Sequence, residues 1–252
     1  MWGLYSFCEY KTDGFTLSQI TPFPTSCTIA CPQPAVLSQP FYYKTQGEQA
    51  FVFVSQDNQY VLKIAKNRHY FLYDNLSRLT LPAFIKKMVL KKKEKASQRI
   101  QRNLNGYILG FTEAADLTGI VYINLKTPST DAVTLVDKIG IRHKVCLKDV
   151  AFIVQKKGTS LSKMLSKADA EIALRSFFQT IHEAKQRGIQ DTDPGFHRNF
   201  GFCGNSPFFM DVGGLEKRES VDYTKMMGRL FSFIKDQNPE LLPIFDEEIR
   251  SL

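Results

Sequence analysis

Three short runs of strand-forming residues stand close together in the first third of the chain. They read FYYKT, AFVFV and YVLKIA, and all three lie between residues 40 and 66. Aromatic and β-branched residues favour strands, and the QDNQ break between the last two runs is typical of a turn. The stretch therefore predicts a strand followed by an antiparallel hairpin.

Residues 81–104 predict one long helix after this hairpin. Pro82 suits the first turn of a helix, and good helix formers follow it. Phe84, Ile85 and Met88 recur at helical spacing, and basic residues fill most of the remaining surface. A solvated face is the simplest interpretation of the sequence KKKEK, with contact to an anion or an acidic membrane as the alternative.

Strand-like runs return between residues 106 and 155, where the sequence reads GYILGF, GIVYINL, AVTLV and VAFIVQ. The sequence QKKGTSLSKML then predicts a turn and a short helix. A longer helix is expected at 168–187, with Gly188 at its C-terminal cap. Two further helices are expected at 221–235 and 239–251.

This order predicts an α+β fold with two lobes. Residues 1–40, rich in proline, serine and threonine, are interpreted as an N-terminal extension. Residues 41–155 are expected to form a β-rich N-terminal lobe with one long helix. Residues 156–252 are expected to form a reduced, helical C-terminal lobe.

Composition and charge favour a globular protein with anionic partners. Hydrophobic residues make up 43% of the 252 residues and charged residues 23%, which is ordinary globular composition. The formal charge is +8, from 33 Lys and Arg against 25 Asp and Glu. That excess favours nucleotides, phosphorylated ligands or an acidic membrane surface, and charge alone does not choose among them. No specific contact with nucleic acid is expected.

The five cysteines indicate a reducing compartment rather than a metal site. Only Cys27 and Cys31 lie close together, and no second pair or flanking histidine completes a zinc-binding spacing. Glu9, Lys11 and Asp13 interrupt the N-terminal segment before the apolar core of a signal peptide develops. No run approaches the roughly 18 apolar residues of a membrane span. The chain is therefore expected to be cytoplasmic, with peripheral membrane contact as a further option.

The segment GIQDTDPGFHRNFGFCGNSPFFMDVGGL, residues 188–215, concentrates polar side chains between short apolar runs. Asp193 lies six residues before Asn199, and Asp211 follows twelve residues after Asn199. The runs FGF and PFFM suit a small hairpin that would bring Asn199 and Asp211 close together. Aspartate and asparagine oxygens are ligands that magnesium prefers, although the same residue types also form turns by bonding to their own backbone.

This pattern resembles the protein-kinase-like superfamily. DVG at 211–213 is similar to the Asp-Phe-Gly motif, and Asn199 stands where the family has its catalytic-loop asparagine. YVLKIAK is similar to the strand that bears the phosphate-binding lysine, which would be Lys63. TQGEQAFVF occupies the glycine-loop position, with Gly47 and Val52 at matching spacing. VAFIVQKKGTSLSKML is similar to the strand, hinge and short helix that join the two lobes, and FFQTIHEAKQRGIQD is similar to the long helix before the catalytic loop. These segments stand in the order that the family has.

The resemblance implies a site that uses ATP and magnesium. Lys63 would contact the α and β phosphates, with Glu94 as its partner on the helix. Asp193 would orient the acceptor hydroxyl or act as its base. Asn199 and Asp211 would hold magnesium.

Glu94 has a second interpretation. It is the one acidic residue of its predicted helix and lies 31 residues after Lys63, farther than the usual interval of the family. It could instead pair along its own helix, with Lys91 or Gln98.

Several departures from the family pattern argue against a conventional protein kinase. The His-Arg-Asp triplet is replaced by the sequence DTD, which ends at Asp193, and the interval from there to Asn199 is one residue longer than usual. Only Gly47 remains of the glycine loop. No Ala-Pro-Glu motif follows Asp211, and 41 residues remain after it, too few for a standard activation segment and peptide-docking lobe.

The short second half and the basic surface are more similar to small-molecule or sugar kinases of the superfamily, including the lipopolysaccharide core kinases. This resemblance implies a phosphotransferase that uses ATP and magnesium to modify a hydroxyl of a small-molecule or glycolipid acceptor. One alternative is a weak or inactive pseudokinase that acts as a binding or scaffolding module. Another is a HipA-like protein kinase, since FHRNFGF is similar to the His-x-Lys-Asn stretch of that group.

Overall fold

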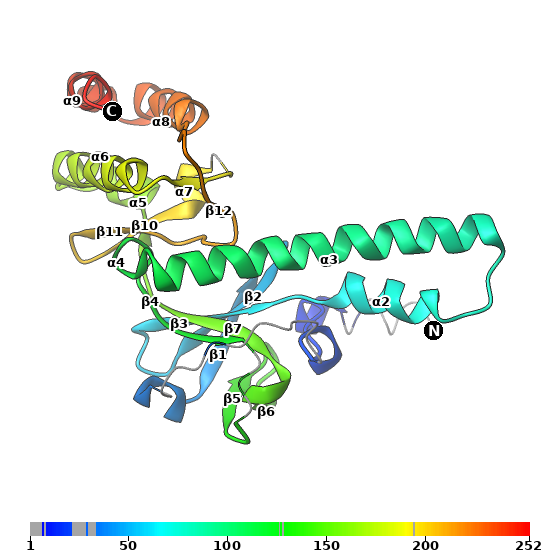
Figure 1. Cartoon of the computed structure of the whole chain (residues 1–252). Helices are drawn as coiled ribbons and strands as arrows, with labels where there is room; N and C mark the ends of the chain where they lie inside the picture. Colours follow the sequence, from blue (N-terminus) through cyan, green and yellow to red (C-terminus); the bar gives the residue numbers. More distant parts are fainter. Residues whose placement is uncertain are drawn as a thin grey trace. The chain divides into compact units, whose positions relative to one another are not determined.

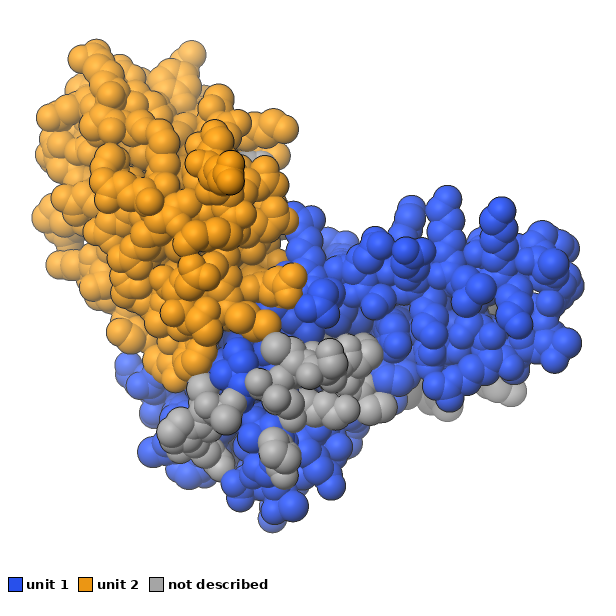
Figure 2. Space-filling model, viewed as in Figure 1, with its two compact units in different colours: residues 1–104, 122–155 blue, residues 105–121, 156–252 orange. Residues whose placement is uncertain are grey.

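The computed structural model describes residues 7, 9–21, 29, 34–125, 127, 129–193 and 195–252. The two neighbouring cysteines considered above lie outside the described residues. The chain forms two compact units, which Figure 2 shows in different colours. Unit 1 contains residues 1–104 and 122–155, and unit 2 contains residues 105–121 and 156–252.

Unit 1 is built on a seven-stranded sheet (Figure 1). The strands are β1 Phe41–Gln46, β2 Ala50–Ser55, β3 Tyr60–Ala65, β4 Ile120–Leu125, β5 Ala132–Val136, β6 Arg142–Cys146 and β7 Ala151–Lys156. They lie in the order β4-β7-β3-β2-β1-β5-β6. Three short 3-10 helices accompany them among the described residues: η1 Leu17–Gln19, η2 Ala35–Ser38 and η3 Leu147–Asp149.

The predicted hairpin is present as β2 and β3. These strands pair antiparallel, with Val54 opposite Val61 and Ala50 opposite Ala65. Asn58, in the QDNQ turn between them, has a φ of 61°, a left-handed conformation that asparagine tolerates better than most residues. β1 also pairs antiparallel with β2, so the three expected strands lie side by side.

Side chains of β2 and β3 alternate between the two faces of the sheet. Phe51, Leu62 and Ile64 are fully buried in the main hydrophobic core of unit 1. Lys63 stands between two of these core residues, so it lies on the other face of the sheet. Val52 is directly opposite it on β2.

Residues that precede the sheet also join its core. Phe15, Ile20 and Leu37 are all buried within the same cluster. The ring of Phe15 packs edge-on against Phe51, with centroids 5.2 Å apart, and against Phe53 at 5.3 Å. The described part of the N-terminal extension therefore contributes to the stability of unit 1.

Two helices follow β3: α2 spans Arg68–Ser77 and α3 spans Ala83–Thr112. The sequence did not predict α2, which lies beside the first part of α3 (Figure 1). Asp74 of α2 forms an ion pair with Lys93 of α3 at 2.7 Å. The hydrogen bond from Lys93 is the main reason that the pKa of Asp74 lies below its ordinary value.

The predicted strand at GYILGF is wrong, because α3 continues through it to Thr112. Tyr107 and Leu109 are buried on the helix. Gly106 does not break the helix but lets it approach the backbone of the DVG segment. A Cβ atom at position 106 would lie 2.2 Å from the carbonyl oxygen of Val212, so only glycine fits there.

Unit 2 contains the end of α3 together with helices and short strands. The helices are α4 Ala115–Thr118, α5 Leu161–Met164, α6 Ala170–Gln186, α7 Phe196–Asn199, α8 Thr224–Gln237, η4 Pro239–Leu241 and α9 Leu242–Ile249. The strands are β8 Thr159–Ser160, β9 Ile189–Asp191, β10 Phe200–Cys203, β11 Ser206–Phe209 and β12 Leu215–Lys217. They form a sheet of order β11-β10-β8 and the pair β12-β9. The helices predicted in the last third of the sequence are confirmed.

The amphipathic helix α6 forms the centre of the unit 2 core. Leu174, Phe177 and Ile181 are buried along one face, and the ring of Phe177 lies 4.8 Å from that of Phe200. Gly188 follows the helix with a φ of 67°, as the predicted C-terminal cap requires. The end of this helix leads directly into β9.

The α+β class is confirmed, and two units are present. A β-rich unit bears Lys63 and a long helix, and a helical unit follows with a polar hairpin. No helix in the described part of the chain combines the length and the apolar character that a membrane crossing requires.

Candidate catalytic and metal-binding site

A short two-stranded sheet in unit 2 holds two polar segments together. β9 pairs antiparallel with β12, with Asp191 opposite Leu215. Next to this pair, the carbonyl oxygen of Gly214 accepts two hydrogen bonds from Thr192, one from its backbone nitrogen at 3.1 Å and one from Oγ1 at 2.9 Å. The segment that carries Asp193 is therefore fixed against the DVGG turn.

A buried hydrogen-bond network centres on Asp191 and Asn199, which are 5% and 1% exposed. Asn199 Nδ2 donates to Asp191 Oδ2 at 2.8 Å and to the carbonyl oxygen of Asp193 at 3.0 Å. Asp191 Oδ1 accepts from the backbone nitrogen of Asp193 at 2.9 Å. Because Asn199 Nδ2 is a donor in both contacts, Oδ1 is the side-chain atom with which Asn199 could bind a cation.

The predicted hairpin joins Asn199 to Asp211. β10 and β11 pair antiparallel, with Phe200 opposite Phe209. At the open end of the hairpin, the carbonyl oxygen of Asn199 accepts a hydrogen bond from the backbone nitrogen of Asp211 at 3.3 Å. Asp211 Oδ1 accepts from the backbone nitrogen of Gly213, also at 3.3 Å. The hairpin and the Asp191 network together bring Asp193, Asn199 and Asp211 into one region.

The carboxyl group of Asp191 has a perturbed pKa. Burial is the largest cause and raises its pKa to about 7. Hydrogen bonds from Asp193 and Asn199 oppose this rise, and the negative charges of Asp211 and Asp193 add to it. Asp193 and Asp211 are themselves exposed. Three carboxyl groups thus share one environment, in which a bound cation would be favourable.

We expect Asp191 to make the stability of the metal-free chain depend on pH. Its pKa is raised from 3.8 to about 7 in the folded state, so between these values the folded chain binds a proton that the unfolded chain releases. The free energy of unfolding should therefore fall as pH rises through this window and level off above about pH 7. The fall should be on the order of 4 kcal/mol at most.

Urea unfolding in EDTA at a series of pH values measures this effect. Asp191→Asn should abolish this part of the fall, whereas Asp236→Asn, at an exposed position of α8, should retain it. If the unfolding free energies of the parent and Asp191→Asn differ by the same amount at every pH from about 4 to about 8, the expectation is contradicted.

The donor set suits magnesium bound together with a phosphate. Among the described residues, no group of three or more histidine, cysteine, aspartate or glutamate side chains is arranged to hold a metal ion. The predicted set instead combines Asn199 Oδ1 with the carboxylate of Asp211. Magnesium accepts few protein oxygens, retains several waters and takes further ligands from phosphates. The two residues therefore fit magnesium that arrives with a nucleotide.

The residues predicted to contact the nucleotide lie in unit 1. Lys63 is half-buried on β3 and faces Val52 across the hairpin. Gly47 lies in the tight turn between β1 and β2, where its backbone nitrogen donates to the carbonyl oxygen of Ala50 at 2.8 Å. A Cβ atom at position 47 would find its nearest neighbour at 3.8 Å, so the fold itself accepts a side chain there. Glycine would matter at this position if a ligand approached the backbone.

Glu94 contacts Gln98 on its own helix, which is one of the two local pairings that the sequence allowed. It is exposed on α3 and accepts a hydrogen bond from Gln98 Nε2 at 3.4 Å. Its pairing with Lys63 stays a prediction.

Two structural residues near these positions were not identified from the sequence. Lys66 Nζ donates to the carbonyl oxygen of Gly47 at 2.7 Å and also contacts Gln46 Oε1, so it holds the turn at the glycine-loop position. Gly106 allows α3 to contact the DVG segment, as described above. A glycine inside a helical pattern is one signal of such close packing, whereas no motif marks Lys66.

No family model matches the chain, and no curated protein sequence matches it. Among solved structures, the chain is similar to WbdD. A crystal structure of WbdD has 16% sequence identity and a TM-score of 0.40, and the match covers 77% of this chain and 36% of that chain. A co-crystal structure of WbdD with a kinase inhibitor has 17% identity and a TM-score of 0.39, with 77% and 37% covered. A structure described as the bifunctional kinase-methyltransferase WbdD has 18% identity and a TM-score of 0.39, with 75% and 34% covered.

The chain spans about a third of the length of these solved chains. Similarity at this level supports no statement about the activity, substrate or partners of this chain. The resemblance to the protein-kinase-like superfamily rests instead on the sequence motifs, which lie on the hairpin that carries Lys63, on α3 and on the hairpin that joins Asn199 to Asp211.

Proposed function

We propose that the chain is a phosphotransferase that uses ATP and magnesium to phosphorylate a hydroxyl of a small-molecule or glycolipid acceptor. The observation that carries this proposal is the arrangement of Asp193, Asn199 and Asp211 around the buried Asp191. Phosphoryl transfer needs oxygen ligands for magnesium, a cation on the phosphates and a carboxylate for the attacking hydroxyl. The chain has a candidate for each role.

Asp193 is the candidate that would orient the acceptor hydroxyl. Its side chain is exposed, while its backbone nitrogen donates to Asp191 and its carbonyl oxygen accepts from Asn199. A carboxylate on a fixed backbone reduces the entropy lost when a hydroxyl is aligned for in-line attack. The same carboxylate can take the hydroxyl proton as the new bond to phosphorus forms.

Asn199 and Asp211 are the candidates that would hold magnesium. Asp191 fixes the amide of Asn199 through its Nδ2 group, so the Oδ1 atom keeps one orientation. Asp211 is exposed and adjoins Asn199 through a backbone hydrogen bond. Magnesium, when bound, would neutralise charge on the nucleotide phosphates and polarise the group that is transferred.

Lys63 is the candidate that would contact the α and β phosphates. A strand position fixes its backbone, so its ammonium group can be placed as a point charge with little loss of entropy. Val52 lies opposite Lys63 and would pack against the nucleotide. Gly47 would let the backbone of the turn approach the phosphates.

A nucleotide-binding module without transfer activity is the second candidate function. Glu94 favours it, because this glutamate is exposed and bonded to Gln98, whereas active kinases pair their strand lysine with a helix glutamate.

Thermal unfolding with ATP, with and without magnesium, combined with an assay for ADP release, separates the two functions. An enzyme should be stabilised by ATP with magnesium and release ADP when an acceptor is supplied. A binding module should be stabilised without releasing ADP, and a chain that ATP does not stabilise would contradict both.

The tip formed by the end of α2 and the start of α3 carries the features of a membrane contact. Leu79, Phe84 and Met88 are 53%, 76% and 52% exposed. Lys87 and Lys91 are exposed on the same part of α3. Exposed apolar side chains beside lysines are typical of helices that lie at the surface of an acidic membrane. We propose that this tip is the peripheral contact, which would bring the chain to a glycolipid acceptor.

Cosedimentation with lipid vesicles tests the membrane contact. The chain should bind vesicles that contain phosphatidylglycerol more tightly than vesicles of phosphatidylcholine alone, since each lysine near the surface contributes about 1 kcal/mol. The double variant Phe84→Ser, Met88→Ser should lose this binding. Ile172→Ser, at a position of α6 that is 56% exposed, should retain it. Equal binding of the parent chain to both kinds of vesicle would rule out the proposed contact.

A further inference from the structure

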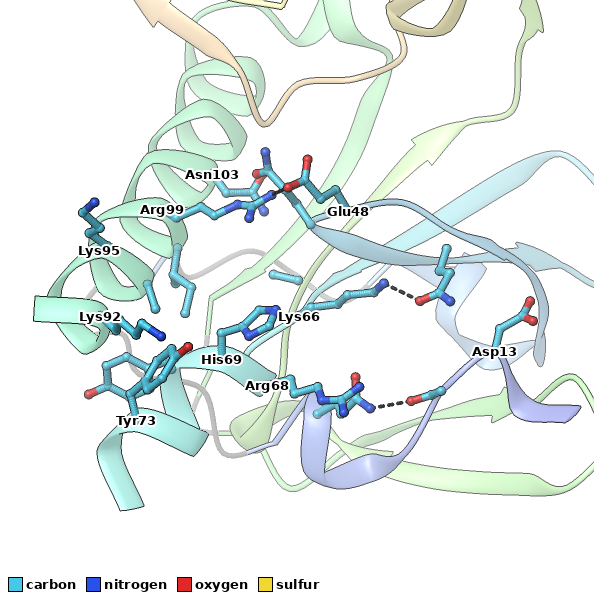
Figure 3. Close-up of a pocket in the computed structure, with 18 of the residues that line it drawn as sticks. Asp13, Glu48, Lys66, Arg68, His69, Tyr73, Lys92, Lys95, Arg99 and Asn103 are labelled. Carbon is cyan, nitrogen blue, oxygen red and sulfur yellow. Dashed lines mark hydrogen bonds and ion pairs between the residues drawn. The ribbon is translucent and has the colours of Figure 1, made fainter. Parts of the chain in front are cut away.

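A cavity of about 570 Å³ lies in unit 1, beside the turn at the glycine-loop position. Its walls come from residues 9–19, from that turn, from the end of β3, and from α2 and α3 (Figure 3). Cavities of this size are typical of sites for small organic ligands. None of Gly47, Val52 and Lys63, the residues proposed to contact a nucleotide, is among its lining residues.

Positive charge exceeds negative charge in this cavity. Its lining contains five lysines and arginines against three carboxylates, an excess of two positive charges. The lysines and arginines are Lys66, Arg68, Lys92, Lys95 and Arg99, and the carboxylates are Glu9, Asp13 and Glu48. Figure 3 shows that these cations come from different elements around the cavity.

Each of the three carboxylates has a cationic partner. Glu9 pairs with Arg68 at 3.2 Å, and Glu48 pairs with Arg99 at 2.5 Å. Asp13 pairs with Lys138, which lies outside the cavity lining, at 2.6 Å. In the part of the chain that the structure describes, no ion pair joins a carboxylate to Lys66, Lys92 or Lys95. These three lysines therefore supply the positive charge that a ligand would meet.

Lys66 is held in the cavity wall by several contacts. Its Nζ donates to the carbonyl oxygen of Gly47 at 2.7 Å and lies 4.5 Å from the ring centroid of Phe51. The side chain is half-buried. Burial, and then the neighbouring charge of Arg68, lower the pKa of Lys66. A bound anion would offset both effects.

We propose that this cavity binds a phosphate monoester, at a site separate from that of the nucleotide. A monoester carries a charge of roughly −1.5 to −2 at neutral pH, which matches the excess of two positive charges in the lining. A carboxylate would neutralise only half of it. Lysine ammonium groups bind phosphate as point charges with three donors each, and Tyr73 and His69 line the same cavity.

Binding of hexose 6-phosphate, measured by calorimetry in the absence of nucleotide, tests this site. The double variant Lys92→Gln, Lys95→Gln removes two lining charges and should weaken binding by about tenfold or more, which corresponds to ~1.4 kcal/mol. The double variant Lys225→Gln, Lys235→Gln removes the same charge from exposed positions of α8, outside the cavity, and should bind as the parent does. All four lysines are exposed residues of helices and glutamine is a good helix former, so both variants should unfold at the temperature of the parent.

Two further arms distinguish the source of the phosphate and the identity of the site. Vesicles that contain phosphatidic acid present a monoester on a lipid, and those that contain phosphatidylglycerol present a diester. A preference for phosphatidic acid that disappears in Lys92→Gln, Lys95→Gln, without binding of hexose 6-phosphate, would support the site with a lipid as its ligand. Competition by ATP with magnesium would show that the cavity belongs to the nucleotide site and overturn the proposal. The proposal also fails if no monoester probe binds, or if the control variant loses as much affinity as the cavity variant.

Discussion

Replacing Asp193 by asparagine should reduce phosphoryl transfer by roughly 10²- to 10⁴-fold and leave nucleotide binding nearly unchanged. Asparagine retains the Oδ1 acceptor for the backbone nitrogen of Gly195, which lies 3.1 Å away, so the loop should keep its conformation. The contacts to Asp191 and Asn199 involve only the backbone of Asp193 and should also remain. The substitution therefore removes the negative charge and the proton acceptor without removing the support of the site.

The measurement is the release of ADP under single-turnover conditions, with acceptors drawn from an untargeted screen. Stabilisation by ATP with magnesium is measured on the same preparation. Asp236→Asn makes the same chemical change at an exposed position of α8 and should retain full activity. If Asp193→Asn transfers phosphate at the parental rate, Asp193 is not the residue that orients the acceptor.

The parts of the fold that could be predicted from the sequence depend on local signals. The β2–β3 hairpin has alternating side chains and a turn in which Asn58 tolerates a positive φ. Helix α6 has a continuous apolar stripe and ends before Gly188, whose positive φ stops the helix. Both signals are contained in about 20 neighbouring residues, so a period of 2 or 3.6 and the turn residues suffice to find them.

The errors arise where distant contacts decide the local conformation. GYILGF is rich in strand formers, yet it is helical because its two glycines let α3 pack closely on other segments of unit 2. A Cβ atom at position 110 would lie 3.0 Å from Ile120 Cδ1, and one at position 106 would meet Val212. Helix α2 was missed because it has only a weak apolar face, and the ion pair between Asp74 and Lys93 joins it to α3. Such contacts follow from the folded arrangement and not from the periodicity.

In the candidate site, too, the sequence predicts what depends on neighbouring residues and does not predict what depends on distant contacts. Asn199 and Asp211 could be paired in advance because a short hairpin separates them, and β10 and β11 form that hairpin. The role of Asp191 could not, since no local pattern shows that this carboxyl group is buried. Its burial and its bond to Asn199 Nδ2 indicate that it supports the loop structurally. The basic cavity could not be predicted from the sequence either, because its lining residues range from Glu9 to Asn103.

Replacing Asp211 by alanine should remove the part of the stabilisation by ATP that depends on magnesium. With ATP and magnesium at about 100 times the dissociation constant, binding should stabilise the parent chain by about 2.7 kcal/mol. The variant should show the same small stabilisation by ATP whether magnesium is present or absent. Asp211 is exposed, and within the described part of the chain its carboxylate accepts one hydrogen bond, from the backbone nitrogen of Gly213. The substitution should therefore cost little folding stability.

The comparison with Asp193→Asn separates the two roles that the carboxylates are proposed to have. Asp193→Asn should keep the magnesium-dependent stabilisation and lose transfer, whereas Asp211→Ala should lose both. Asp246→Ala, at an exposed position of α9, removes a carboxylate from the same unit and should behave as the parent. A magnesium-dependent shift in Asp211→Ala equal to that of the parent would exclude Asp211 as a ligand. Asn199 would then lack its partner across the hairpin, and the metal site would have to be sought among other oxygens, because a single neutral amide cannot hold magnesium beside the phosphates.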